Sequence, residues 1–153
     1  MGKRLMAIDP GASGGIAWHD ADGVVRCENM PEGMTAQCDW LSDLAMSRTS
    51  PVECILEKVG TYVKGNAVGG ACKFARHCGA LEAALYCFGV SVRQVAPTVW
   101  QRSLGALSND KPTRKREIRE LMARRYPHLH VTLKTADALG ILTWAIHAEG
   151  GAE

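Results

Sequence analysis

The chain has 153 residues, a formal net charge of +2 and 46% hydrophobic residues, which fits one globular domain with an apolar core. No stretch approaches the ~18 consecutive apolar residues that a membrane-spanning helix needs, so we expect no membrane partner. The first residues run directly into a predicted strand, and we therefore expect no signal peptide and a cytoplasmic protein. The six cysteines form no C-x-x-C pair, and we expect most of them to be reduced and buried as small hydrophobic residues.

The first half of the chain is predicted to begin with three strands joined by tight turns, at 4–9, 14–19 and 23–29. Apolar residues at helical spacing then predict a helix over 35–47, with Thr35 as its N-cap. Pro51 ends this part of the chain. We expect these strands to pair antiparallel, because the turns between them are short.

The second half alternates strands and helices. A buried strand is predicted over 52–57, followed by a glycine-bearing loop over 60–70 and a helix of about twenty residues, 68–88. Gly89 is its expected C-terminal cap, and the residues at 90–95 alternate as a strand.

The chain is predicted to end with helices over 113–125 and 135–149, and the loop over 101–112 is the one segment expected to be flexible. This order of elements predicts an α/β domain of residues 1–153. It holds a mixed five-stranded sheet, with three antiparallel strands and then two parallel ones, flanked by helices.

The turn after the first predicted strand holds the most informative residues. Asp9 ends that strand, and Gly11, Gly14 and Gly15 follow it in a loop of small residues. Because glycines carry no side chain, a large anionic group can approach this backbone closely. A carboxylate beside an open backbone suits a divalent cation that holds a phosphate, although an ordinary hairpin with a turn aspartate has the same residues.

Two further acids occupy comparable positions: Glu57 ends the fourth predicted strand, and Asp137 lies in the first turn of the last predicted helix. If the first and fourth strands are neighbours and the last helix begins over their ends, the three carboxylates converge. Converging carboxylates repel unless divalent cations neutralise them, so we expect Mg²⁺, with Mn²⁺ as a substitute. Two such ions stabilise both oxygens of an in-line phosphodiester displacement.

Each acid has a simpler explanation as well: Asp9 could serve its turn, and Asp137 could interact with the helix dipole. Glu57 could pair with Lys58 or Arg93.

Basic residues concentrate in 111–125, which holds seven Lys and Arg residues against two acids. Such a local excess on a near-neutral domain favours a polyanion as partner, although a solvated helix face gives the same pattern. The residues that we predict to contact DNA phosphates are Lys111, Arg114, Lys115, Arg116 and Arg119. Arg124 and Arg125 could instead cap the end of their helix.

Taken in order, five parts of the chain resemble the RuvC-type Holliday junction resolvases of the ribonuclease H-like superfamily, above all the short phage-type members. These parts lie at 8–11 with 15–17, 56–59, 65–66 with 79–82, 95–100, and 136–141. The resemblance implies a homodimeric, magnesium-dependent nuclease that binds four-way and other branched DNA and nicks two strands symmetrically. It also implies metal-binding acids at the positions of Asp9, Glu57 and Asp137.

The resemblance extends to a loop that follows Glu57. Lys58 and Lys64 flank this loop and are expected to meet the DNA backbone. Tyr62 matches an aromatic residue that stacks on an unpaired base at the crossover, an interaction worth ~1–3 kcal/mol. Packing of Tyr62 on the domain surface is the simpler alternative.

Two features bear on the dimer that the resemblance implies. The helix at 68–88 is rich in Gly and Ala and could pack closely against the sheet or against a symmetry mate. Trp100 and Trp144 lie among apolar neighbours and are expected in the core or at an interface.

The chain departs from the family pattern at Lys134, where relatives usually have an acid or a histidine one helical turn before the last aspartate. An ammonium group cannot bind a metal, but it could hold the scissile phosphate or replace the charge of one metal. We therefore count Lys134 among the predicted catalytic residues. His128 or His130 could supply the missing ligand if the preceding loop folds inward.

Three alternatives remain open at this point. The glycine turn also resembles that of sugar and acetate kinases, but 153 residues leave no room for their second domain, so we expect no nucleotide cofactor. A related ribosomal-RNA-processing nuclease would share the fold and metals. A catalytically weak or silent junction-binding protein would explain Lys134.

Overall fold

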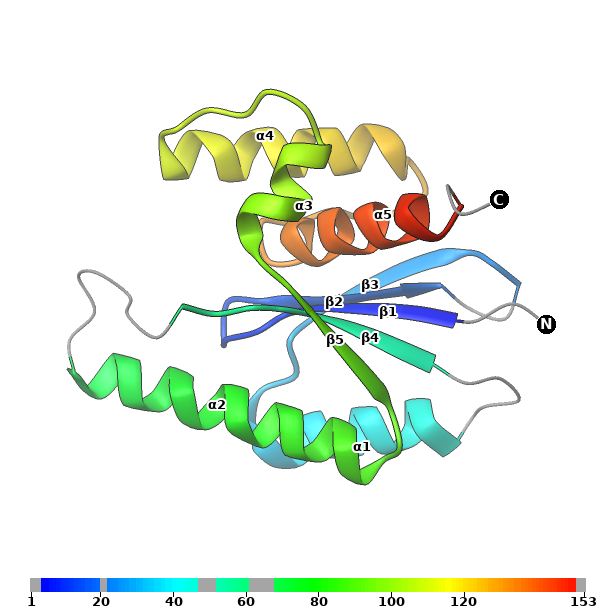
Figure 1. Cartoon of the computed structure of the whole chain (residues 1–153), viewed down its shortest axis with the longest axis vertical. Helices are drawn as coiled ribbons and strands as arrows, with labels where there is room; N and C mark the ends of the chain where they lie inside the picture. The colour runs from blue at the N-terminus through cyan, green and yellow to red at the C-terminus, as the bar shows by residue number, and fades with distance from the viewer. Residues whose placement is uncertain (1–3, 20–21, 47–51, 61–67, 151–153) are drawn as a thin grey trace.

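The computed structural model of the chain describes residues 4–19, 22–46, 52–60 and 68–150. A five-stranded sheet lies between two layers of helices (Figure 1). Helices α1 and α2 cover one face of the sheet, and α5 packs against the other face with α3 and α4 outside it. The predicted α/β class with a mixed sheet is confirmed.

The sheet has the strand order β3-β2-β1-β4-β5. Its strands are β1 (Arg4–Asp9), β2 (Gly15–His19), β3 (Val25–Asn29), β4 (Val52–Glu57) and β5 (Ser91–Val95). The first three strands pair antiparallel, whereas β4 lies parallel to both β1 and β5. Parallel pairing of β1 with β4 brings the carboxyl ends of these strands to the same edge of the sheet, where Asp9 and Glu57 lie.

The helices are α1 (Gly33–Met46), α2 (Val68–Cys87), α3 (Pro97–Ser103), α4 (Lys111–Arg125) and α5 (Ala136–Gly150). Two predicted starts are wrong: α1 begins before Thr35, and α4 begins at Lys111 because the Asp110 side chain caps it by accepting from the Thr113 amide. The predicted end of α2 is confirmed. Gly89 has a φ of 68°, and the Val90 amide donates to the Leu85 carbonyl, as in a Schellman cap.

The sequence analysis missed α3. This helix has only seven residues, too few for a periodic pattern, and its signal is Pro97 at the first turn. The loop predicted over 101–112 is correspondingly shorter, because residues 101–103 belong to α3 and residues 111–112 to α4. The Ser108 amide donates to the Glu117 carboxylate and Arg114 donates to the Ser108 carbonyl, so the connection is tied to α4.

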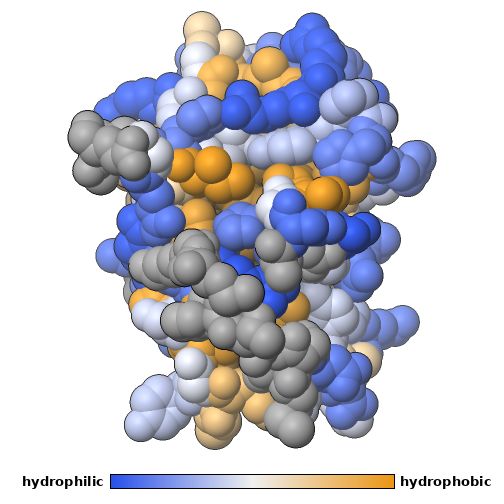
Figure 2. Space-filling model, turned by 90° about the vertical axis from the view of Figure 1, so that its right-hand side faces the viewer, coloured by the Kyte–Doolittle hydropathy of each residue, from blue (hydrophilic) through white to orange (hydrophobic). Residues whose placement is uncertain are grey.

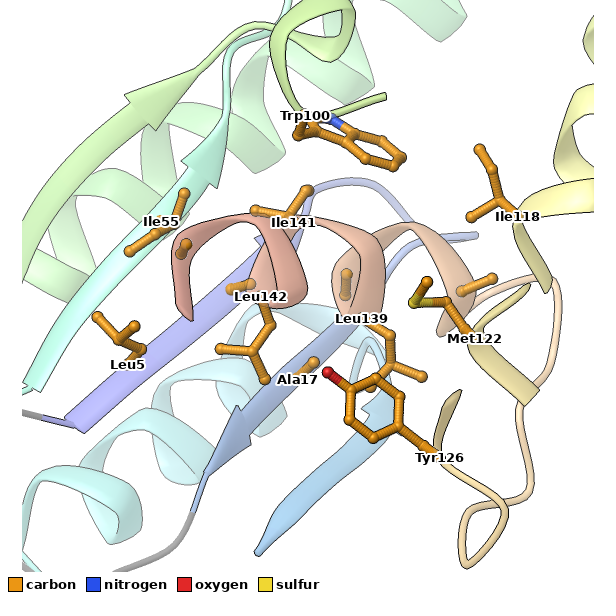
Figure 3. Close-up of a cluster of buried hydrophobic side chains, with 14 of the residues drawn as sticks. Leu5, Ala17, Ile55, Trp100, Ile118, Met122, Tyr126, Leu139, Ile141 and Leu142 are labelled. Carbon is orange, nitrogen blue, oxygen red and sulfur yellow. The ribbon is translucent and has the colours of Figure 1, made fainter. Parts of the chain in front are cut away.

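The apolar core has two parts, one on each face of the sheet. Figure 3 shows the part under α5, where Trp100, Ile141 and Leu142 meet side chains from the sheet and from α4. Trp100 is fully buried, and Trp144 packs against this core from a half-buried position. The expectation that most cysteines are buried is wrong: Cys54 is buried, but Cys72 and Cys87 are exposed on α2.

The end of the molecule that carries the chain termini lies opposite the edge with Asp9 and Glu57 (Figure 1). Hydrophilic and apolar side chains are interspersed on that end (Figure 2). Among the described residues, no helix combines the length and the apolar character that crossing a bilayer requires.

Candidate active site

Three acidic residues approach one another at the carboxyl edge of the sheet. Asp9 and Glu57 end β1 and β4, and Asp137 lies in the first turn of α5, which packs on β1 and β2. The start of α5 comes this close because Gly15 has no side chain. A Cβ there would lie 2.5 Å from the Lys134 carbonyl oxygen, well inside van der Waals contact.

Burial and like charge dominate the electrostatics of Asp9. Desolvation, together with the negative charges of Glu57 and Asp137, raises the pKa of Asp9 from 3.8 to about 8. A hydrogen bond between the two carboxyl groups raises the pKa of Asp9 and lowers that of Glu57, so Asp9 is the group that holds the shared proton. Burial and the neighbouring acids thus favour the protonated form of Asp9.

Trp100 fixes the position of Glu57. Its indole Nε1 donates to Glu57 Oε1 over 3.0 Å, while the ring lies in the core. The ring fits because α5 has Gly140 beneath it, where a Cβ would lie 2.7 Å from the indole. Burial raises the pKa of Glu57, and the bond from Trp100 opposes that rise. Sequence reasoning assigned Trp100 to the core or an interface and missed this second role. The sequence signal that could have pointed to this role is Pro97, because proline favours the first turn of a helix and the short helix that follows carries Trp100.

Cations from one face of α4 oppose these acids. Burial raises the pKa of Asp137, and the charges of Lys115, Arg114 and Lys111 lower it in turn. Positions 111, 114 and 115 lie one turn apart and so share a side of the helix. Lys115 also lowers the pKa of Asp9 and of Glu57, which makes it the cation that faces all three acids.

Carboxylate oxygens are the donors that hard divalent cations prefer. The Asp9 and Glu57 pair fits such an ion, because burial and the neighbouring acids both raise the pKa of Asp9, and a bound cation would favour its carboxylate form. No cluster of three His, Cys, Asp or Glu side chains within the described ranges is arranged to enclose one ion. Asp137 faces the pair from α5 at longer range, through charge rather than through a hydrogen bond with Asp9.

Lys134 lies at a different place from the one that its spacing to Asp137 suggested. Its exposed side chain lines a pocket with Lys73 and Arg76 from α2, and its charge is not among those that shift the pKa of the three acids. His128 interacts through Nε2 with the Val25 carbonyl at 3.0 Å and is thus held at β3.

The remaining predicted DNA-binding residues fall into two groups. Lys58, Arg116 and Arg119 are exposed, and Lys58 lines a pocket of about 340 Å³ together with Glu57. Tyr62 and Lys64 lie outside the described residues, and the stacking and backbone contacts predicted for them stay predictions.

Arg93 does not pair with Glu57. Its guanidinium lies 3.1 Å from the Glu53 carboxylate and 3.8 Å from that of Glu149, and it stacks on the Trp144 ring. An ion pair with Arg93 is thereby excluded as the simpler explanation for Glu57. At the far end of α4, Arg125 donates to His147 rather than facing the acids.

Comparison with known proteins gives a fold and no family assignment. No family model matches the chain, and no curated protein matches it either. Solved structures do match it, among them two T. thermophilus structures. A Thermus thermophilus RuvC bound to a Holliday junction substrate is 20% identical, with a TM-score of 0.62 over 98% of this chain and 97% of that one. A second T. thermophilus RuvC structure is 18% identical, with a TM-score of 0.57 over 97% and 96%. The chain thus has the ribonuclease H-like fold of these proteins.

Proposed function

We propose that this chain is a divalent-cation-dependent endonuclease that nicks four-way and other branched DNA as a homodimer. The observation that carries the proposal is the pair of half-buried carboxyl groups, Asp9 and Glu57, which share a proton opposite Lys115. A structural ion pair would place a cation against each acid, whereas here two acids lie against each other. That arrangement costs stability and is typical of sites with a function.

Each residue has a part in the proposed reaction. Asp9 and Glu57 bind the cation, with Asp137 adding its charge from α5. Bound Mg²⁺ or Mn²⁺ supplies charge neutralisation and an activated water for phosphodiester hydrolysis. Lys115 pairs with the oxygens of the phosphate, and Trp100 keeps Glu57 oriented through its indole N–H.

The electrostatic pattern supports DNA as the substrate. Lys111, Arg114 and Lys115 face the acids, so a phosphate backbone can approach the carboxylates along the face of α4. The cations offset the repulsion between the acids and the DNA. Selectivity for branched DNA rests on the fold that the chain has in common with the junction-bound T. thermophilus RuvC.

The proposed dimer draws on α2. Gly and Ala residues make up much of this helix, and Cβ atoms added at Gly69, Gly70 and Gly79 would meet nothing within 4 Å. A second copy could therefore approach the C-terminal half of this helix closely, past the turns that carry Lys73 and Arg76. Two copies related by a two-fold axis match the symmetry of a four-way junction.

The test is to incubate the protein with a synthetic four-way junction and Mg²⁺ and to map the nicks on each strand. Wild-type protein is expected to make paired nicks, and Asp9→Asn is expected to bind the junction without cutting it. Asp39→Asn removes an exposed aspartate from α1 and serves as the matched control, which should cut normally. Equal cutting by wild type and Asp9→Asn contradicts the proposal.

A second candidate is a junction-binding protein without nuclease activity. Lys134 in place of an acid and the lack of a three-ligand cluster among the described residues favour it. Tight binding without nicks in either Mg²⁺ or Mn²⁺ would establish this candidate. Preferred cutting of structured RNA in the same assay would instead point to an RNA-processing nuclease.

A further inference from the structure

A second hollow lies at the same edge of the sheet as the carboxylates, beyond the turn that follows β1. It has a volume of about 660 Å³, and its walls come from that turn, the β3–α1 connection, α2 and the residues before α5. In the sheet register, Asp9 on β1 lies opposite Gly15 on β2, and Gly15 lies opposite Asn29 on β3. Asn29 lines the hollow. Two strand spacings, or about 10 Å, therefore separate Asn29 from Asp9.

Positive charge dominates this pocket, which we call the cationic pocket. Lys73 and Arg76 project into it from adjacent positions on one side of α2, and Lys134 faces them from the other wall. Glu32 is the one acid among its described lining residues. None of these three cations forms an ion pair within the described ranges, so an anion bound between them would relieve their mutual repulsion.

His77 adds a polar ring to the lining of the cationic pocket. Its ring lines the cationic pocket, and its Nε2 is buried without a hydrogen-bond partner among the described residues. A buried polar atom of this kind is rare in folded proteins, because it loses the hydrogen bonds that water would provide.

One wall of the pocket is apolar and favours a nucleotide over a bare inorganic anion. Met30, Pro31 and Met34 form one wall, and the Met34 side chain is 49% exposed. Apolar side chains of this size suit the sugar and base that accompany each phosphate of a strand. An inorganic phosphate would fill a small part of 660 Å³ and would leave that wall without a contact.

We propose that the cationic pocket binds the backbone of the DNA strand that passes the carboxylates, a few nucleotides from the bond that is cut. The separation of about 10 Å corresponds to about three nucleotides of rise along a strand. This inference rests on the proposed function, since it takes its ligand from the strand at Asp9. In this arrangement Lys73, Arg76 and Lys134 together hold the strand by its phosphates.

The test measures the affinity for a four-way junction against salt concentration, by fluorescence anisotropy in EDTA, so that no cutting takes place. Each lost phosphate contact lowers the log–log salt slope by about 0.9. The double variant Lys73→Gln with Arg76→Gln is therefore expected to lose about 1.8, and Lys134→Gln, outside that helix, about 0.9. Arg124→Gln with Arg125→Gln removes the same charge at the far end of α4 and is expected to keep the wild-type slope.

The outcomes separate the possibilities. A smaller slope in the pocket variants alone supports the proposal, even if the wild-type protein proves unable to nick the junction with Mg²⁺. An unchanged slope in the pocket variants, or an equal loss in the control, overturns it. If millimolar inorganic phosphate competes with the junction at constant ionic strength, and no variant changes the salt slope, the pocket is a site for small anions. That result overturns the proposal as well. Circular dichroism checks that each variant folds.

Discussion

Replacing Asp9 by asparagine should change how the stability of the metal-free protein depends on pH. The folded state raises the pKa of Asp9 from 3.8 to about 8, chiefly through burial. Between these two pH values the folded protein keeps a proton that the unfolded chain has lost. Its stability therefore falls as pH rises through this range. Asparagine has nearly the same shape and no charge at any pH, so it removes this contribution.

The size of the effect follows from the shift itself. One pH unit of proton linkage is worth about 1.4 kcal/mol, so the whole shift corresponds to about 6 kcal/mol as an upper value. Between about pH 5 and about pH 8, Asp9→Asn is expected to gain up to ~4 kcal/mol of unfolding free energy relative to wild type.

Urea unfolding in EDTA across this pH range measures the effect, with tryptophan fluorescence as the signal. Asp39→Asn, an exposed aspartate on α1, is the control and should follow wild type. Adding Mg²⁺ at about pH 8 should stabilise wild type and leave Asp9→Asn unchanged. Parallel pH profiles for wild type and Asp9→Asn would refute the reasoning, because they would mean that Asp9 is ionised in the folded state at no cost.

Three further predictions concern the residues around the carboxylates. Lys115→Ala with Arg116→Ala should lower the salt slope of junction binding by about 1.8, and an unchanged slope would mean that this face of α4 is merely solvated. Lys134→Ala should lower that slope by about 0.9 and leave the nicking rate of the bound complex unchanged. Loss of nicking with unchanged affinity would instead mean that the Lys134 ammonium lies at the scissile phosphate. Trp100→Phe keeps an aromatic side chain but removes the N–H bond to Glu57, which should raise the pKa of that acid and weaken Mg²⁺ binding. The lost bond should cost about 1.5–3 kcal/mol of stability, in addition to the packing lost with the smaller side chain. A pH–rate profile that does not move in Trp100→Phe would argue against a positioning role.

The sheet could be predicted from the sequence because its strands can be recognised from local sequence patterns. Apolar runs that end at Asp9 and Glu57, separated by turns or a helix, determine which strands are parallel neighbours. Once β1 and β4 lie side by side, the two acids must share an edge. The approach of Asp137 required only that α5 begin over that edge, which Gly15 permits.

The directions of individual side chains could not be predicted from the sequence. Lys134 precedes Asp137 by three residues, yet it lies outside α5 and lines the cationic pocket with residues from α2. Spacing along the chain predicts a shared helix face only where both residues belong to the helix. Trp100 illustrates the same limit, because its apolar neighbours predict burial but say nothing of the partner that its indole nitrogen finds.

The order in which the chain supplies its acids has a consequence for the cell that makes the protein. Asp9 and Glu57 come from β1 and β4 in the first sixty residues, whereas Asp137 and the residues of α4 come from the last third of the chain. An unfinished or partly unfolded chain thus lacks the helices that bury and complete the acidic cluster. The proposed cutting of DNA therefore requires that α4 and α5 have been synthesised and have folded onto the sheet.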